Sequence, residues 1–162
     1  MVRLKHRYLI VQIIFEQANA NEKINMVDIL NVLKDRFLEL YGDVGFGTYA
    51  KSLALKYYNN EHNLFILRCT RDGEINVRLG LSCLQNIKQI NCICRVLDIA
   101  GSTRTCKDKM KDIIIALNTY TSDYISTPLI TPDHCSSTNI DINNRLSDKT
   151  RHYIDEIDKL SL

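Results

Sequence analysis

The amino-acid sequence predicts an α+β domain over residues 1–125, with its elements in the order β-α-β-β-α-β. Two observations carry this prediction. Apolar residues alternate at period two in residues 1–15 and 49–58 and dominate residues 64–70 and 90–99, which is typical of strands, and stretches with helical apolar spacing fall between them. The 162 residues, 45% of them hydrophobic, are enough to bury one core without disulfides or metal.

The first strand belongs to the most informative stretch, residues 1–15. Arg3, Lys5 and Arg7 gather near its start with no acid among them, and alternating apolar residues over the rest of the stretch predict a half-buried strand. A basic cluster held at the start of a strand is already positioned to bind a polyanion. The net charge of +2 is small, but cations outnumber acids only before residue 128.

The first helix is predicted to follow Asn25, a good N-cap residue, because Asp28 stands three residues later and apolar residues then recur at spacings of three and four. Gly42 is expected to end this helix. Residues 42–47 contain three glycines but lack the Lys-Ser/Thr ending of a P-loop and the strand-to-helix context of a dinucleotide motif. They are predicted to be a flexible helix-to-strand connection.

A hairpin is predicted next. Residues 49–58 alternate again, a short polar turn follows, and residues 64–70 form the next strand. The alternation puts Leu55 and Tyr57 on one face. Arg68 interrupts the otherwise apolar second strand of the hairpin, and it either faces outward or has a partner.

The second helix is expected after Gly73 and continues to about residue 86, with Ile75, Leu79, Leu81 and Leu84 in its apolar pattern. The strand over residues 90–99 has apolar residues on both faces, which indicates a central or covered strand. This order is that of the ferredoxin-like or split-βαβ plan, in which two helices cover one face of a four-stranded sheet.

A second basic stretch, residues 101–107, precedes an additional helix at the end of the domain. It contains the hydroxyl residues Ser102 and Thr105 and the cations Arg104 and Lys107. Unpaired backbone N–H groups and the helix dipole attract anions at a helix start, so these residues form a candidate phosphate cradle. A plain Ser/Thr N-cap with solvated charges explains the same residues. Both interpretations stay open.

The remaining residues, 126–162, differ in composition from the domain. Both prolines and runs of Ser, Thr and Asn over residues 126–144 predict a flexible linker. Apolar residues at helical spacing over residues 151–160 allow one short helix in the tail.

Several function classes are disfavoured by the sequence. Several of the six cysteines fall at periodic positions in apolar runs, which favours buried thiols in a reducing, intracellular compartment, and the spacing of Cys92 and Cys94 is not that of a zinc knuckle. No stretch approaches the ~20 apolar residues of a membrane span, and residues 1–15 suit a strand better than a signal peptide. The four histidines are scattered, and no group of carboxylates or activated nucleophile indicates catalysis.

Four short motifs are present in a specific order and spacing: VRLKHRYL at residues 2–9, LKYYN at residues 55–59, LRC at residues 67–69 and GSTRTC at residues 101–106. Together they resemble the Pop-five protein subunit family of eukaryotic and archaeal ribonuclease P, shared in eukaryotes with ribonuclease MRP. The resemblance covers residues 1 to about 120.

The resemblance implies an RRM-like α+β sandwich that binds the catalytic non-coding RNA of the particle and pairs with a TIM-barrel-like protein subunit among other subunits. It implies a nuclear and nucleolar ribonucleoprotein that removes the 5′ leader of precursor tRNA and, as MRP, processes ribosomal RNA. The chemistry is carried by magnesium on the RNA, with no cofactor and no catalytic side chain on this protein.

Arginine and lysine side chains placed against phosphates are what an RNA-binding subunit needs. Tyr8 is expected to pack or to stack against RNA, and Arg68 is included beside the two basic stretches. The residues assigned to RNA binding are Arg3, Lys5, Arg7, Tyr8, Arg68, Ser102, Arg104, Thr105 and Lys107.

Two other function classes remain open. A stand-alone RNA-recognition motif reads single strands by stacking bases on aromatic residues of its middle strands, and here the strand over residues 64–70 offers Phe65 and no glycine. A small ferredoxin-like enzyme, ligand-binding domain or protein-interaction domain shares the fold. An enzyme or ligand-binding domain would need a polar pocket with a titrating pair, for which the sequence offers no candidate.

Overall fold

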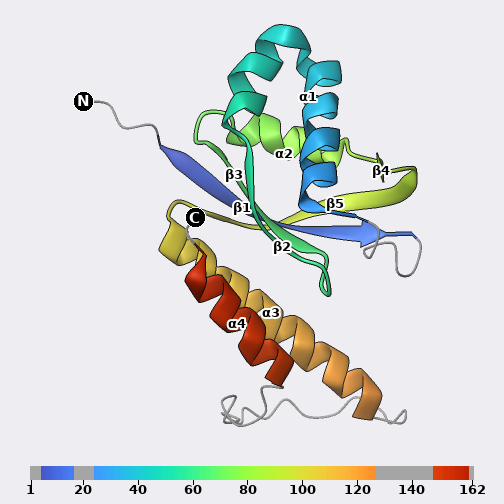
Figure 1. Ribbon diagram of the computed structural model, residues 1–162, viewed down its shortest axis with the longest axis vertical. Coiled ribbons are helices and arrows are strands. Elements are labelled where there is room, and N and C mark those ends of the chain that lie inside the picture. The colour runs from blue at the N-terminus through green and yellow to red at the C-terminus, as the bar shows by residue number, and fades with distance from the viewer. Residues whose placement is uncertain (1–4, 17–23, 127–147, 161–162) are drawn as a thin grey trace, which may run out of the picture. The chain divides into compact units, whose positions relative to one another are not determined.

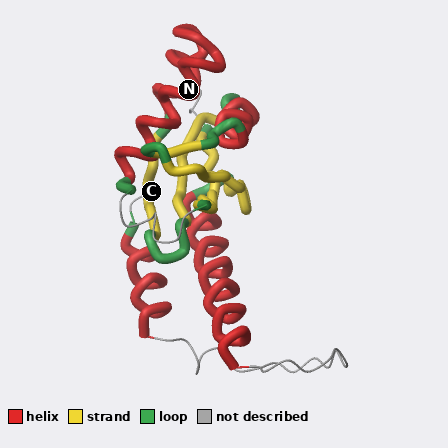
Figure 2. The backbone as a smooth tube through the Cα atoms, turned by 90° about the vertical axis from the view of Figure 1, so that its right-hand side faces the viewer, coloured by secondary structure: helices red, strands yellow, loops and turns green. Residues whose placement is uncertain are grey.

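The computed structural model describes residues 5–16, 24–126 and 148–160. Its elements, labelled in Figure 1, are β1 His6–Phe15, α1 Met26–Tyr49, the 3₁₀ helix η2 Ala50–Ser52, β2 Ala54–Asn59, β3 Leu64–Thr70, α2 Glu74–Ser82, β4 Asn86–Ile87, β5 Ile90–Ala100, α3 Thr103–Ser126 and α4 Asp148–Lys159. Figure 2 shows the strands in yellow and the helices in red. The predicted α+β order β-α-β-β-α-β is confirmed, and the short β4 is an addition that the sequence did not indicate. The chain divides into two compact units, one ending at Cys106 and one beginning at Lys107.

β1 is the central strand of a five-stranded sheet in the order β2-β3-β1-β5-β4. It pairs antiparallel with β3 on one side and with β5 on the other, and Leu9 lies opposite both Leu67 and Ile99. The expectation of a half-buried strand is wrong, because Tyr8 and Ile10 on the second face are buried as well. The first basic residues are therefore attached to the middle of the sheet rather than to an edge.

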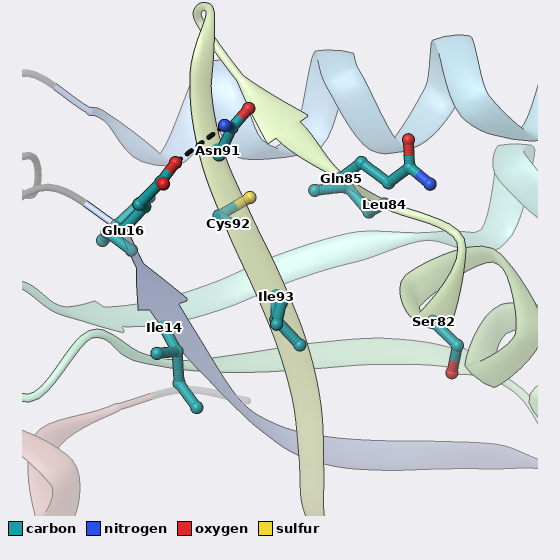
Figure 3. Close-up of a pocket in the computed structure, with 9 residues that line it drawn as sticks. Ile14, Glu16, Ser82, Leu84, Gln85, Asn91, Cys92 and Ile93 are labelled. Carbon is teal, nitrogen blue, oxygen red and sulfur yellow. Dashed lines mark hydrogen bonds between the residues drawn. The ribbon is translucent and has the colours of Figure 1, made fainter.

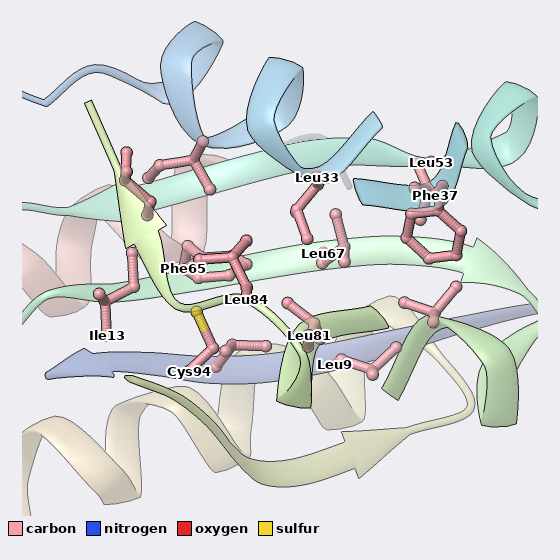
Figure 4. Packing of buried hydrophobic residues seen from close by; sticks show 14 of the residues in the cluster. Leu9, Ile13, Leu33, Phe37, Leu53, Phe65, Leu67, Leu81, Leu84 and Cys94 are labelled. Carbon is pink, nitrogen blue, oxygen red and sulfur yellow. The ribbon is translucent and has the colours of Figure 1, made fainter. Parts of the chain in front are cut away.

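The main hydrophobic core lies between one face of the sheet and the helices α1 and α2 (Figures 1 and 4). Phe65 and Leu67 of β3, Leu33 and Phe37 of α1 and Leu81 of α2 are fully buried in it. Burying each such side chain stabilises the fold by about 1.5–3 kcal/mol. This core fixes the position of the sheet and therefore of the basic residues at its end.

α1 begins as predicted but extends further. The backbone N–H of Asn25 donates to Oδ2 of Asp28 at 2.8 Å, which is one half of a capping box. Gly42 has φ +62° and ψ −169°, a conformation that favours glycine, and it kinks the helix. Residues 43–49 are helical beyond the kink, so the prediction of a flexible connection over residues 42–47 is wrong. A glycine at positive φ redirected the helix instead of ending it.

β2 begins later than predicted, because η2 precedes it. Its ladder with β3 also shifts register: Leu55 lies opposite Leu67, whereas Tyr57 lies opposite Ile66. One extra residue in a bulge turns the following side chains to the other face. The prediction that Leu55 and Tyr57 share a face is therefore wrong.

α2 is shorter than predicted, and only Leu81 and Leu84 of its predicted apolar pattern are buried. Ile75 and Leu79 are exposed, whereas Val77 and Gly80 are buried. A Cβ on Gly80 would lie 2.9 Å from Cζ of Phe37. α2 thus approaches α1 closely at a glycine. A pattern of apolar side chains does not include glycine and so could not predict this contact.

β5 contains a second bulge, opposite the middle of β1. Val11 lies opposite Val96, whereas Ile10 lies opposite Asp98. As a result Ile99 packs against the same core as Val96, although strict alternation would place these two residues on opposite faces.

The second unit contains the greater part of α3 together with α4, which run antiparallel beside each other. Nζ of Lys107 donates to the carbonyl oxygen of Asp158 at 2.9 Å, and Nδ2 of Asn118 donates to Oγ1 of Thr150 at 2.9 Å. Residues 127–144 of the predicted linker lie outside the described residues. Among the helices that the structure describes, none has the length and apolar character needed to cross a membrane.

Candidate nucleic-acid interface

The two basic stretches meet at the end of the sheet where β1 starts and β5 ends. Tyr8 lies opposite Ala100, the last residue of β5, so Arg7 lies beside Gly101. A Cβ on Gly101 would be 3.1 Å from Nη1 of Arg7. The Arg7 side chain therefore lies against the glycine backbone directly before the start of α3.

Ser102 is the N-cap of α3. Its Oγ accepts a hydrogen bond from the backbone N–H of Thr105 at 3.2 Å and lies 2.9 Å from the Thr105 hydroxyl oxygen. Its carbonyl oxygen accepts from the N–H of Cys106 at 3.1 Å. The N–H groups of Thr103 and Arg104 belong to the first turn of α3. Backbone N–H groups in the first turn of a helix have no acceptor within the helix, and they attract anions. The N-cap and the phosphate cradle, which the sequence left as alternatives, are thus compatible. The cap orders the turn whose N–H groups would bind a phosphate.

Three cations at this end of the first unit are exposed and unpaired: Lys5, Arg71 and Arg104. None of them has a side-chain hydrogen bond or ion pair within the described part of the chain. The backbone N–H of Arg71 donates to the carbonyl oxygen of Lys5 at 2.9 Å, one rung beyond the pairing of His6 with Thr70. Sequence reasoning missed Arg71. The signal was the expected pairing of the first and third strands, which puts the residue after β3 beside Lys5.

Arg7 shares an acid with a second arginine that the sequence did not single out. Nε of Arg7 lies 3.9 Å from Oε2 of Glu74, and Nη1 of Arg78 lies 3.7 Å from Oε1 of the same carboxylate. Nη1 of Arg7 also donates to the carbonyl oxygen of His6 at 3.4 Å. Glu74 and Arg78 lie on α2, so this helix and the turn at Gly101 both contribute to the surroundings of Arg7.

Tyr8 and Arg68 lie on the other face of the sheet from Arg7. They are directly opposite each other in the β1–β3 ladder and alternate with core residues such as Leu9. Tyr8 is 7% exposed and Phe65 is fully buried, so neither ring is presented for base stacking. Arg68 is half-buried, and its Nε has no hydrogen-bond partner among residues 5–16, 24–126 and 148–160. The structure does not bring Arg68 together with Arg7.

Two further predicted contacts stand apart from this end of the sheet. Arg3 lies outside the described residues. Lys107 belongs to the second unit, where it donates to Asp158 of α4. Their assignment to RNA binding stays a prediction.

The groups around Arg7 suit binding rather than bond cleavage. Burial raises the pKa of the Cys69 thiol to about 12, with Glu74 adding to the rise and Arg7 opposing it. At neutral pH this thiol is protonated and a poor nucleophile. Guanidinium groups, a lysine and helix N–H groups instead offer donors to phosphate oxygens.

A hollow of about 620 Å³ lies toward the other end of β1 and β5 (Figure 3). Ile14 and Ile93, which face each other across the two strands, are exposed beside it. Nδ2 of Asn91 donates to Oε2 of Glu16 at 2.7 Å at its rim. Its lining is mainly apolar and carries no cation, so it does not extend the basic surface.

A family model described as the Rpp14/Pop5 family matches residues 7–111. The probable ribonuclease P/MRP protein subunit POP5 of Arabidopsis thaliana is 26% identical over 114 residues, which cover 67% of this chain and 76% of that protein. The Schizosaccharomyces pombe ribonuclease P/MRP protein subunit POP5 is 28% identical, over 64% of this chain and 81% of that protein. Ribonuclease P protein component 2 of Archaeoglobus fulgidus is 26% identical, over 69% and 94%. A chain in the structure of yeast ribonuclease MRP aligns with a TM-score of 0.48 at 11% identity, over 64% of this chain and 79% of that one.

Proposed function

The chain belongs to the Rpp14/Pop5 family, and we propose that it is an RNA-binding protein subunit of a ribonuclease P or ribonuclease MRP particle. In this role it holds the phosphate backbone of the particle's non-coding RNA. The contacts come from Lys5 and Arg7 at the start of β1 and from Ser102, Arg104 and Thr105 at the start of α3.

The observation that carries this proposal is the position of Arg7 against Gly101. It joins the two basic stretches into one surface that contains a capped helix start and the side chains of Lys5 and Arg104, which are unpaired among the described residues. Cations and helix N–H groups that are fixed before RNA arrives favour phosphate binding without sequence readout. The relatives support the assignment of the RNA, because curated proteins similar to this chain are named as ribonuclease P/MRP subunits.

The finer role follows from the family. The particle would remove the 5′ leader of precursor tRNA or, as MRP, process ribosomal RNA, in the nucleus and nucleolus. The chain would contact a TIM-barrel-like subunit as its protein partner. Magnesium ions would be held by the RNA, and this chain would contribute cations and no catalytic side chain.

The test is purification of the tagged full chain from its native cells, followed by RNA sequencing and mass spectrometry. Arg7→Gln with Arg104→Gln is compared with the matched control Lys34→Gln with Arg95→Gln, which removes the same charge from α1 and β5. The proposal requires that wild type and control recover one structured non-coding RNA, several protein subunits and precursor-tRNA or ribosomal-RNA cleavage. The first pair must lose the RNA. Recovery of the chain alone, or with diverse messenger RNAs, overturns it.

A further inference from the structure

We infer that the RNA-binding surface continues from Arg7 across the turn after β3 and onto α2, where Arg71 of the turn and Arg78 of the helix are two further phosphate contacts. These two arginines are called the α2 pair below. This inference rests on the proposed function and deepens it. Neither arginine lies in the two basic stretches that the sequence singles out.

The first step is the position of Arg71. Its backbone N–H donates to the carbonyl oxygen of Lys5 at 2.9 Å, so the two residues lie side by side directly beyond the paired ends of β1 and β3. Both side chains are exposed, and neither is paired within the described residues. Two free cations side by side repel each other at short range, and an anion between them removes that repulsion.

The second step is the carboxylate of Glu74. An exposed pair such as Glu74 and Arg78, four residues apart on one helix, is by itself an ordinary surface contact that contributes little. Here the same carboxylate also lies 3.9 Å from Nε of Arg7, which comes from β1. Glu74 thus keeps Arg78 of α2 close to Arg7 and joins the helix to the surface at the end of the sheet.

The third step is the charge balance. The region contains the cations Lys5, Arg7, Arg71 and Arg78 and the acids Asp72 and Glu74, so its formal charge is +2 before Arg104 is counted. Arg78 keeps an exposed side chain, at 53%, while Glu74 is more enclosed, at 21%. Asp72 is exposed as well, but cations outnumber it at the surface and the shared acid lies beneath them, which is an arrangement that attracts a phosphate backbone.

α2 also exposes Ile75 at 76% and Leu79 at 52%. These two residues would suit a protein partner, and a protein-binding α2 is the competing outcome of the test. The continuity of Arg71 with Lys5, and of Arg78 with Arg7, favours RNA.

The test measures the affinity of the purified full chain for the non-coding RNA that wild type recovers from cells, by filter binding over a range of salt concentrations. Arg71→Gln with Arg78→Gln is compared with Lys34→Gln with Arg95→Gln. Each lost phosphate contact lowers the slope of log affinity against log salt by about 0.7–0.9, so the α2 pair is expected to lower it by about 1.4–1.8 and to weaken binding on the order of ten-fold at 0.1 M salt. The charge-retaining pair Arg71→Lys with Arg78→Lys restores the slope.

The outcomes distinguish a failure of the proposed function from a failure of the extension onto α2. If wild type recovers no structured RNA, the proposed function fails. If Arg7→Gln with Arg104→Gln weakens binding but the α2 pair matches the control, the extension onto α2 alone is overturned. A loss of protein subunits from the purified particle with the RNA slope unchanged overturns it too, and assigns α2 to a protein contact. If the Gln pair does not fold, the Lys pair decides, because a slope below that of wild type despite retained charge contradicts phosphate contacts of this kind.

Discussion

Nη1 of Arg7 lies 3.1 Å from the point where a Cβ on Gly101 would stand. The atom in the way is the far end of a flexible side chain, so Gly101→Ala is expected to fold normally and to move Arg7. The free energy of unfolding, measured by thermal denaturation, should change by no more than about 0.5 kcal/mol. The salt slope of RNA binding should become shallower by up to about 0.9, the contribution of one phosphate contact. An unchanged slope would show that the position of Arg7 does not matter to RNA.

Gly80→Ala is expected to destabilise the domain. Its Cβ would be 2.9 Å from Cζ of Phe37, a ring that is fully buried and has no free space to enter. Overpacking of this kind costs about 1–3 kcal/mol. Urea unfolding of the full chain measures it.

Gly47→Ala is the matched control for Gly80→Ala. No atom lies within 4 Å of the Cβ it would add, and alanine is the better helix former by up to about 1 kcal/mol. The control should be neutral or slightly stabilising. Equal midpoints for the two variants would contradict the close approach of α2 to α1.

Lys107→Gln and Arg104→Gln should have opposite effects, although three residues separate them. Lys107 donates to Asp158, so its loss is expected to speed amide exchange in α4 and to leave RNA affinity nearly unchanged. Arg104 is exposed and has no partner in the part of the chain that the structure describes, so its loss should weaken RNA binding and leave α4 protected. Hydrogen exchange and filter binding on the same samples measure both effects. If Lys107→Gln weakens RNA binding while amide exchange in α4 stays normal, Lys107 belongs to the RNA interface.

His62 makes stability depend on pH. Burial lowers its pKa from the ordinary value near 6.5, with Glu61 opposing the shift. In the window between the lowered folded pKa and 6.5 the unfolded chain binds more protons, so stability rises with pH there. The contribution is fully present above pH 6.5 and is lost as the pH falls toward the folded pKa. Urea unfolding at pH 5 and pH 7.5 should show a smaller difference for His62→Gln than for wild type.

Local patterns were enough for much of the fold. The strand segments of β1 and β3, the cap at Asn25 and the order of elements each depend on neighbouring residues, and all are found in the structure. The errors have non-local causes. Bulges in β2 and β5 depend on the partner strand, and the burial of Gly80 depends on Phe37, a residue of another helix.

The candidate site follows the same division. The meeting of Arg7 with the start of α3 follows from the pairing of the first and last predicted strands. Glu74 and Arg78 could not be found in this way, because their approach to Arg7 is set by how α2 packs on the sheet. Tyr8 was assigned two roles, and its burial leaves packing as the one that fits.

The placement of β1 between β3 and β5 has a consequence for the entropy of binding. Pairing with β3 holds the backbone of β1 from His6 onward, and pairing with β5 holds it from Tyr8 onward, so Arg7 has already lost its main-chain freedom when the chain folds. Ordering one residue's backbone costs about 1–2 kcal/mol. A basic tail of the same composition would meet that cost at each encounter with RNA, whereas this strand meets it once, during folding.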